Sequence, residues 1–401
     1  MDKKPKRMVP EVRFKGFTDD WEQRKVRDVA DKHIGGGTPS TKNTRFWDGN
    51  IPWIQSSSIT ENNIWKVTIN KHISEQALHE SAAKLIPKGS IAVVTRVGVG
   101  KIALMNYKYS TSQDFLSLVN LQEVPSFITL VLYQQLKIVS HQLQGTSIKG
   151  ITSNDLLNLP LKFPNKYEQS KIVKIVKLID RLITLQQRKL EQSKQLKKAM
   201  LQRLLVSKKG KLIPNIRFKD FTETWEQRKF GDIANRESKQ IESTSDIPSV
   251  EYDDIVSNQG NLNKDISTKK AKKKGIEFND TNVLYGKLRP YLHNWLNASF
   301  TGVAVDDWWV LKPVKIRKNF LYYLIQTKKY DNVANLSSGS KMPRSDWNLV
   351  SNTAFSIPNT KEEQEKIGIF LSDLDSLITL HQRRLNQLSK IKKFCLQKMF
   401  I

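Results

Sequence analysis

Apolar and polar positions alternate along two stretches of the chain in a way that predicts two long helices. From Glu168 and again from Glu363, apolar residues recur at steps of three and four, which is the spacing of one apolar stripe along a helix. Pro164 and Pro358 precede the two stretches, and each first turn carries glutamate, as helix N-termini favour. Each helix would extend over about 38 residues, or roughly 57 Å.

A stripe of that length is too long for one small domain to cover. We therefore expect the two helices to pack on each other as an antiparallel coiled coil. The alternative is that each helix packs only on its own domain.

The segments before the two helices have a different pattern, that of short strands. Between residues 31 and 161, the pieces IPWIQ, KVTIN, SIAVVTRV, GKIALMNY and FLSLVNL are separated by turn residues, and a helix is predicted over 126–144. Between residues 235 and 356 the pattern recurs in IPSVEYDDI, TNVLYGKLRPYL and TGVAVDDWWVLKP, followed by the helical NFLYYLIQTKKYDNVANL. The chain therefore predicts an α+β fold with two domains of mixed strands and helices, separated by the long helices.

The two halves are copies of one plan. VPEVRFKGFTDDWEQRKVRDVA from Val9 and IPNIRFKDFTETWEQRKFGDIA from Ile213 agree at 13 of 22 positions, and the long helices match at an offset of 195. This internal duplication predicts pseudo-twofold symmetry. The expected divisions are 1–161 and 208–358 for the two repeats with their variable domains, and 162–207 and 359–401 for the helices. The basic stretch 208–211 would be the linker between the halves.

IPWIQSSSI from Ile51 aligns with IPSVEYDDI from Ile247, which keeps the apolar alternation and changes the polar positions. A constant frame with a changed polar face is what two modules that read different targets need.

The charge of the chain points to a polyanionic partner. Lys and Arg number 66 against 39 Asp and Glu, a formal net charge of +27. The lone Cys395 excludes an internal disulfide, which fits a reducing cytosol. The charged N-terminus lacks the apolar run of a secretory signal, and FITLVLY is too short to cross a bilayer. We expect a cytoplasmic protein with no membrane span.

Motifs of catalysis are weak in this sequence. TRVGVGK from Thr95 has Thr where a phosphate loop needs its first glycine, and Ile102 follows Lys101 where that loop needs Ser or Thr. A glycine-rich hairpin or a loop near a DNA backbone is the better interpretation. The scattered histidines and single cysteine form no zinc pattern, and no two prolines are adjacent as an adenine methyltransferase motif requires. The chain predicts no active site and no cofactor of its own.

The segments HIGGGTPSTKNTRFWDGNIPWIQ from His33, GTSIKGITSNDLLNLPL from Gly145 and SGSKMPRSDWNLVSNTAFSIP from Ser338, with the two LITL-containing helices, resemble the specificity subunit of type I restriction-modification systems. The resemblance covers essentially the whole chain. It implies two target-recognition domains that each read one half of a split double-stranded DNA target, with helices that set the spacing and dock methyltransferase subunits. The second variable region has no counterpart of GGGTPS, which implies a recognition domain of another subtype.

The resemblance also implies partners and their cofactors. Two methyltransferase subunits and two restriction subunits would bring S-adenosylmethionine, ATP and Mg²⁺ to the complex. The alternative is a duplicated basic scaffold that binds nucleic acid without sequence specificity. Such a scaffold explains the charge but not two unlike polar faces on near-identical frames.

Candidate DNA contacts in the first domain lie near the GGGTPS turn, after Trp53, in the glycine-rich hairpin and in the polar loop before residue 150. They are Arg45, Trp47, Gln55, Ser56, Ser57, Arg96, Lys101, Thr146, Ser147 and Lys149. We expect Trp53 itself to belong to the core.

In the second domain, GKLRPYL would place cation, cation and ring on one face of a strand, suited to phosphate or a guanine edge, although an edge strand protected by charge has the same pattern. The candidates are Lys287, Arg289, Tyr291, Ser340, Lys341 and Arg344. STKKAKKKG from Ser267 is either a phosphate clamp or a solvated loop. Asp306 and Asp307 would accept from cytosine or cap a turn.

The repeated FT..WEQRK is too alike in the two halves to read two different DNA sequences. We expect it to pack near the helix ends and to face the shared protein partner. The predicted docking residues are Trp21, Arg24, Trp225 and Arg228.

Overall fold

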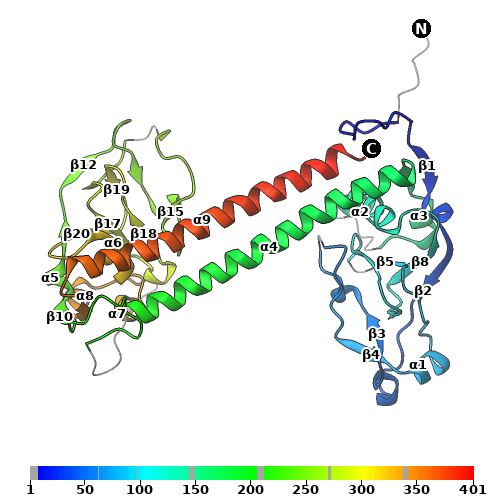
Figure 1. The fold of residues 1–401 in the computed structure, drawn as a ribbon, viewed down its shortest axis with the longest axis horizontal. Helices are drawn as coiled ribbons and strands as arrows, with labels where there is room; N and C mark the ends of the chain where they lie inside the picture. The colour runs from blue at the N-terminus through cyan, green and yellow to red at the C-terminus, as the bar shows by residue number, and fades with distance from the viewer. Residues whose placement is uncertain are drawn as a thin grey trace, which may run out of the picture. The chain divides into compact units, whose positions relative to one another are not determined.

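The computed structural model describes residues 8–61, 63–96, 98–143, 150–205, 212–269, 272–336 and 342–401. The chain forms two compact units (Figure 1): unit 1 comprises residues 1–185 and 385–401, and unit 2 comprises residues 186–384. Each unit contains one variable domain and parts of both long helices. The expected linker at 208–211 lies outside the described residues.

Unit 1 is built on a four-stranded antiparallel sheet. The strand order is β2-β8-β5-β6, formed by Ala30–Gly35, Phe115–Leu121, Ile91–Val94 and Ile102–Leu104. Helix α2 (Pro125–Leu143) confirms the helix predicted over 126–144. A second sheet has the order β4-β3-β7, formed by Lys71–Ile73, Ile51–Ile54 and Ser110–Thr111, with β3 and β7 parallel. Of the predicted strand KVTIN, the structure retains a single bridge between Ile59 and Val67.

Unit 2 repeats this frame. Its main sheet has the order β11-β20-β17-β18, formed by Ala234–Glu237, Trp308–Pro313, Val283–Gly286 and Trp295–Asn297. The second sheet has the order β12-β16-β19-β13, formed by Gln240–Glu242, Lys274–Phe278, Gly302–Ala304 and Ser249–Val250, and β13 pairs in parallel with β19 as β3 does with β7. The predicted helix over NFLYYLIQTKKYDNVANL divides into α6 (Lys318–Leu324) and α7 (Lys328–Ala334).

The repeated EQRK forms a strand that closes each domain. β1 (Glu22–Lys25) pairs antiparallel with β9 (Pro160–Phe163), and β10 (Glu226–Lys229) pairs in the same register with β21 (Ala354–Ile357). Each partner strand lies immediately before a long helix, so the opening repeat joins the start of each variable domain to its end.

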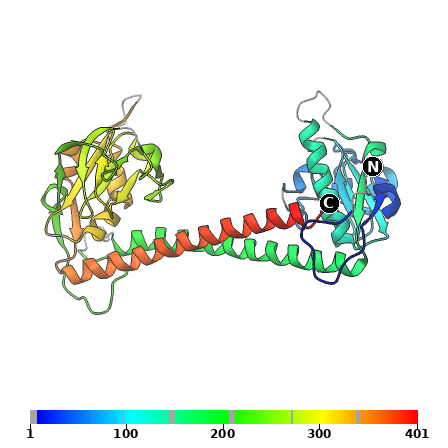
Figure 2. The same cartoon turned by 90° about the horizontal axis from the view of Figure 1, so that it is seen from above.

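The two long helices are α4 (Lys166–Leu204) and α9 (Lys361–Lys398), which confirms both predicted segments. They run side by side in opposite directions (Figures 1 and 2). In unit 1, Asp180 of α4 pairs with Lys392 near the end of α9. In unit 2, Gln186 of α4 contacts His381 of α9. The antiparallel expectation is therefore confirmed.

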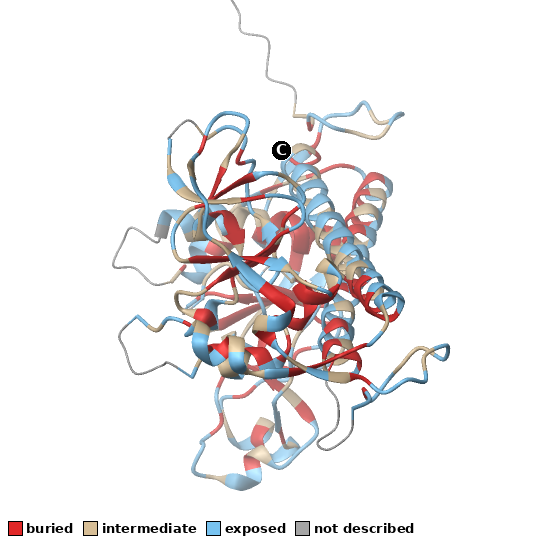
Figure 3. Cartoon of the chain, turned by 90° about the vertical axis from the view of Figure 1, so that its left-hand side faces the viewer, coloured by how far each residue is buried: buried red, intermediate tan, exposed pale blue. Residues whose placement is uncertain are grey.

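Each helix also packs on a domain core, so the alternative arrangement is realised in part. The first turns of α4 and the residues after α9 share one apolar core with Trp21 and Phe127 in unit 1. The end of α4 and the first turns of α9 share the corresponding core with Trp225 and Phe320 in unit 2. Buried positions follow the inner strands and one side of each helix (Figure 3). The two ends of the apolar stripes thus belong to domain cores. In the middle Leu190 is buried, whereas Leu182 and Leu377 of the stripes remain exposed.

Candidate nucleic-acid interface

Unit 2 brings three of the predicted DNA-contact residues to one place. The residue after β17, Lys287, donates its backbone N–H to Asp307 O at 2.9 Å and accepts from Ser345 N at 2.8 Å. Leu288 and Arg344 form an isolated bridge, and Arg289 N donates to Pro343 O at 2.7 Å. The GKLRPYL segment and the segment that ends at residue 346 therefore lie side by side, although they are far apart in sequence.

Asp307 pairs with two of the charged side chains of this surface, those of Lys287 and Arg344. Its Oδ2 accepts from Arg344 Nε at 3.1 Å and Nη2 at 2.9 Å, and its Oδ1 lies 3.4 Å from Lys287 Nζ. Burial disfavours the ionised carboxyl, but the hydrogen bond from Arg344 and the charge of Lys287 outweigh it and hold the pKa of Asp307 below its ordinary value. The Arg344 side chain is 54% exposed. Asp307 thus positions an accessible guanidinium, a role beyond the two that the sequence suggested.

The expected strand alternation of Lys287, Arg289 and Tyr291 is wrong. β17 ends at Gly286, Arg289 has φ +48°, and Pro290–Leu292 form a 3₁₀ helix, η5. Pro290 lacks the N–H that a strand ladder needs and fixes its own φ, so the segment turns. Tyr291 is exposed and Arg289 is half-buried. Among the described residues, Arg289 Nε has no hydrogen-bond partner.

Unit 1 has the same crossing of segments with different side chains. Thr95 N donates to Asp114 O at 2.8 Å, and Thr95 O accepts from Ile151 N at 2.8 Å. These bonds match those of Lys287 with Asp307 and Ser345. The exposed Arg96 and the end of the predicted polar loop at Gly150 are therefore adjacent. Thr146, Ser147 and Lys149, and in unit 2 Ser340 and Lys341, lie outside the described residues.

The turn after the parallel strand carries the other candidates. In unit 1, η3 (Ser56–Ser58) follows Gln55, whose N–H donates to Ser58 Oγ at 3.2 Å, and Lys101 Nζ donates to Ser56 O at 3.4 Å. Ser56, Ser57, Gln55 and Lys101 are thus gathered at one turn. Arg45 and Trp47 lie apart from it in η2 (Thr44–Trp47), where Trp47 packs edge-on against the buried Trp53 at 5.0 Å.

The corresponding turn of unit 2 is η4 (Tyr252–Asp254), in which Glu251 N donates to Asp254 Oδ2 at 2.7 Å. The local geometry is the same as in η3, while every polar side chain differs. The alignment of IPWIQSSSI with IPSVEYDDI is therefore confirmed. Tyr252 Oη donates to Asp307 O at 2.5 Å and accepts from Leu288 N at 3.1 Å, which ties the turn to the Asp307 surface.

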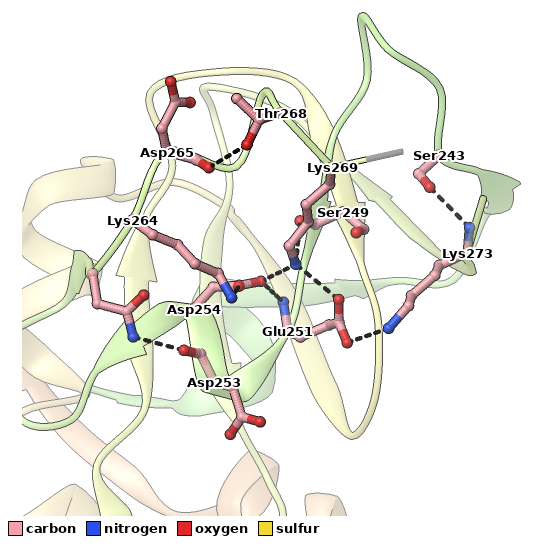
Figure 4. Close-up of polar contacts among 11 residues, drawn as sticks. Ser243, Ser249, Glu251, Asp253, Asp254, Lys264, Asp265, Thr268, Lys269 and Lys273 are labelled. Atoms are coloured by element: carbon pink, nitrogen blue, oxygen red, sulfur yellow. Dashed lines mark hydrogen bonds and ion pairs between the residues drawn. The ribbon is translucent and has the colours of Figure 1, made fainter. Parts of the chain in front are cut away.

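Part of the lysine run after Ser267 is neutralised within the domain (Figure 4). Lys269 Nζ binds Glu251 Oε1 at 2.8 Å and also Asp254, Lys264 Nζ lies 2.9 Å from Asp254 Oδ1, and Lys273 binds Glu251. The hydrogen bond from Lys269, followed by that from Lys273, lowers the pKa of Glu251. These lysines fasten the basic loop to the η4 turn. Among the described lysines of this run, Lys272 and Lys274 are exposed.

Close packing explains why glycine occupies two positions of the GGGTPS motif, Gly36 and Gly37. A Cβ on Gly36 would lie 2.0 Å from Thr111 Oγ1, and one on Gly37 would lie 2.0 Å from the Ala82 carbonyl oxygen. The side chain of Thr38 that follows donates to Gln113 Oε1 at 2.6 Å. The motif is therefore a close backbone crossing that positions the neighbouring residues.

The prediction that the repeated tryptophans face a protein partner is wrong. Trp21 and Trp225 are both 1% exposed and belong to the domain cores, near the helix ends as expected. A large apolar ring gains most from full burial, and the repeat is conserved between halves because it builds the same core twice. Arg24 pairs with Glu22 and Glu123, and Arg228 pairs with Glu226. Both arginines remain about one third exposed and stay docking candidates.

A repeated buried ion pair was missed in the sequence. Arg13 Nε and Nη2 donate to the two carboxylate oxygens of Glu168 at 2.8 Å each, and Arg217 does the same to Glu363 at 2.7 Å each. The signal was present, because RFK and EQ occur at corresponding places in both copies. The pairs join the opening repeat of each half to the first turn of its helix.

Among the described residues, no group of three or more His, Cys, Asp or Glu side chains could hold a metal ion. In that same part of the chain, no helix combines the length and apolar character needed to cross a membrane.

Comparison with known families identifies the duplicated frame. The family described as "Type I restriction modification DNA specificity domain" matches residues 18–195 and again residues 222–390. This chain belongs to that family. The two matches correspond to the two copies of strand-closed variable domain and long helix, so the resemblance seen in the sequence is confirmed.

The chain is also similar to two proteins named as type I restriction enzyme specificity subunits. The chain is 27% identical over 241 residues to the type I restriction enzyme MjaIX specificity subunit of Methanocaldococcus jannaschii, covering 57% of this chain and 54% of the relative. It is 32% identical over 164 residues to the EcoR124I/EcoR124II specificity subunit of Escherichia coli, covering 38% and 39%. These two matches thus span about half or less of each relative's length.

Two solved structures share the fold. The S subunit of a type I restriction-modification system from M. genitalium superposes with a TM-score of 0.65 at 16% identity, covering 98% of this chain and 99% of that one. A chain from a study of assembly and conformational transition of the type I system gives a TM-score of 0.53 at 14% identity, covering 95% and 97%. The two tandem domains with two long helices are therefore a fold that this chain shares with these structures.

Proposed function

We propose that this chain is the DNA sequence-recognition subunit of a type I restriction-modification complex, in which each variable domain reads one half of a split double-stranded target. One observation carries the proposal: the backbone crossing at Thr95 and Asp114 recurs at Lys287 and Asp307, but with unlike polar side chains. The conserved frame fixes where a groove-facing surface lies, and the changed side chains select the bases.

The net charge of +27 supports a long phosphate-contacting surface. Lysine and arginine contacts to phosphate supply salt-dependent affinity without sequence information. The rival scaffold, which would bind nucleic acid without specificity, uses the same charge. It predicts equal affinity for all duplexes.

The catalytic steps would belong to partner subunits. We propose two adenine methyltransferase subunits, which would bring S-adenosylmethionine, and two restriction subunits, which would bring ATP and Mg²⁺. The complex would act in the cytoplasm, where its DNA target lies.

The long helices carry a repeated apolar surface suited to the two methyltransferase subunits. Leu182, Leu185 and Leu196 of α4 are 38%, 45% and 44% exposed, and their counterparts 195 positions later, Leu377, Leu380 and Ile391 of α9, are 45%, 39% and 48% exposed. Large apolar side chains at matching places in both copies favour a partner that binds twice through one kind of interface. The methyltransferase subunits would pack on these positions.

Methylome sequencing of a host with and without this gene, together with its cognate methyltransferase gene, tests the proposal. The expected result is adenine methylation at one bipartite sequence that depends on this chain. Unchanged methylation contradicts the proposed function.

The proposed docking surface has its own test, in which four leucines are replaced with glutamine: Leu182, Leu185, Leu377 and Leu380. This variant should no longer co-purify with the methyltransferase, while the DNA affinity of the isolated chain stays within about twofold. The control replaces the exposed polar neighbours Lys189 and Arg384 with glutamine.

The spacing role of the helices has its own test. Lengthening both helices by one heptad adds roughly 10 Å, comparable to about 3 bp of duplex rise. The gap between methylated half-sites should lengthen accordingly. An unchanged gap excludes the helices as the spacer.

A further inference from the structure

Each unit contains a polar cluster that joins a recognition domain to both long helices. In unit 1, Trp65 Nε1 donates to Asp180 Oδ2 at 2.8 Å, and Lys392 Nζ lies 2.7 Å from Asp180 Oδ1. Trp65 belongs to the variable domain, Asp180 to α4 and Lys392 to α9. We call this set the unit 1 register cluster.

Unit 2 repeats the arrangement with a different aromatic residue. Tyr323 Oη of α6 donates to Asp375 Oδ2 at 2.9 Å, and Lys197 Nζ lies 2.6 Å from Asp375 Oδ1. Asp375 is the counterpart of Asp180 at the offset of 195, and Lys392 is the counterpart of Lys197 at the same offset. The helices keep the aspartate and the lysine, while each variable domain supplies its own donor.

Aromatic rings complete both clusters. Lys177 Nζ lies 4.7 Å from the centre of the Trp65 ring, and Lys197 Nζ lies 5.5 Å from that of Tyr323. Lys197 is 9% exposed, so its charge is partly withdrawn from water and depends on Asp375. The two variable domains thus make the same three-part contact with the helix pair through different aromatic residues.

The apolar contacts between the helices fix their register less strictly than the two Asp–Lys ion pairs do. Leucines and isoleucines repeat every three to four residues, so a slip of one turn exchanges one apolar contact for another. The same slip, about 5.4 Å, would separate each aspartate from its lysine and leave partly buried charges unpaired. A buried polar pair is a known means of selecting one register among several.

Both ion pairs belong to one register. Asp180 and Lys197 are 17 residues apart along α4, and Asp375 and Lys392 are 17 residues apart along α9, in the opposite direction. Either cluster alone therefore selects the alignment that satisfies the other. A slip of one turn would correspond to roughly 1.6 bp at a rise of 3.4 Å per base pair.

We propose that the two register clusters hold the gap between the DNA half-sites to a single length. They would do so by fixing the alignment of α4 with α9 and the position of each recognition domain on these helices. This inference rests on the proposed reading of a split target. Asp180, Lys392, Asp375 and Lys197 are positioning residues that need not touch DNA, and they determine gap selectivity and not the base sequence of either half-site.

The test is methylome sequencing of hosts that express the full chain with its cognate methyltransferase. The variant is Lys197→Met with Lys392→Met, and the matched control is Lys198→Met with Lys393→Met, which removes the same charge from exposed neighbours. The variant should methylate the same two half-sites, with sites whose gap is one or two base pairs longer or shorter modified at least tenfold more often than in the wild type. The control should keep the wild-type gap.

The outcomes separate the two proposals. A wild type without bipartite methylation refutes the proposed function. A bipartite wild type whose gap distribution is unchanged in the Lys197→Met, Lys392→Met variant overturns the register inference alone. If that variant loses all methylation, Asp180→Asn with Asp375→Asn decides, because it keeps the size of both side chains and an oxygen that accepts from Trp65 and Tyr323, and removes the charges that pair with Lys392 and Lys197. A broadened gap in this second variant supports the inference, and an unchanged gap overturns it.

Discussion

Replacing Arg13 with methionine tests whether the repeated Arg–Glu pair holds each opening repeat to its helix. Methionine retains the apolar stem of the arginine and removes the guanidinium. Glu168 is fully buried and would lose both donors, each now at 2.8 Å. Removing one partner of a buried ion pair costs about 3–5 kcal/mol, because the other charge is left without compensation.

The corresponding variant of unit 2, Arg217→Met, should cost less. Glu363 also accepts from Trp225 Nε1 at 3.2 Å, whereas Trp21 Nε1 has no hydrogen-bond partner among the described residues. One retained hydrogen bond to a charged group should spare about 1 kcal/mol or more. Lysine at either position keeps the charge but loses the two-pronged geometry, so its effect should be intermediate.

Hydrogen exchange followed by mass spectrometry measures these losses in the full chain, where a single melting temperature would mix the two units. In Arg13→Met, amides of β1 and β9 should exchange faster by roughly two to four orders of magnitude, while β10 and β21 stay unchanged as an internal reference. The reverse should hold for Arg217→Met. Acceleration of less than about tenfold in β1 and β9 would refute the reasoning that the buried carboxylate depends on Arg13.

Three other predictions concern single residues. Gly37→Ala should destabilise unit 1 by about 1–3 kcal/mol, because the added Cβ would overlap the Ala82 carbonyl. Gly35→Ala is the control, because the space around its Cβ is open. Urea unfolding compares the stability of the two variants. Arg344→Met should lower affinity for the true target by about 1–3 kcal/mol and for unrelated duplexes much less, and an equal loss for all duplexes by fluorescence anisotropy would assign it to phosphate instead. Burial, followed by the charge of Arg27, lowers the pKa of His33, so the unfolded chain binds its proton first as pH falls. Stability of unit 1 should therefore drop below about pH 6.5, and His33→Gln should reduce that pH dependence in thermal unfolding.

The sequence was informative where structure depends on local pattern. The spacing of Ile172, Val176 and Ile179, and of their counterparts in the second copy, predicted both long helices, because one face of a helix recurs every three to four residues. The duplication predicted the repeated frame, since near-identical segments such as EQRK form near-identical strands.

Sequence reasoning failed where a side chain's environment comes from distant segments. Trp21 and Trp225 looked like a shared docking surface and are core residues, because burial is decided by what packs over a ring. The lysine run after Ser267 predicted either a phosphate clamp or a solvated loop, yet Lys269 and Lys273 pair with Glu251 beside the η4 turn.

The sequence by itself determined that the protein has two copies of one frame with a helix after each, and that the polar positions of the variable domains differ. Tertiary structure alone decided which polar side chains lie together: Lys287 with Asp307 and Arg344 in a variable domain, and Asp180 with Lys392 between the long helices. The physical reason is that periodicity records which face of an element is apolar, but not which distant element covers it. Charge partners across that contact are fixed only when the chain has folded.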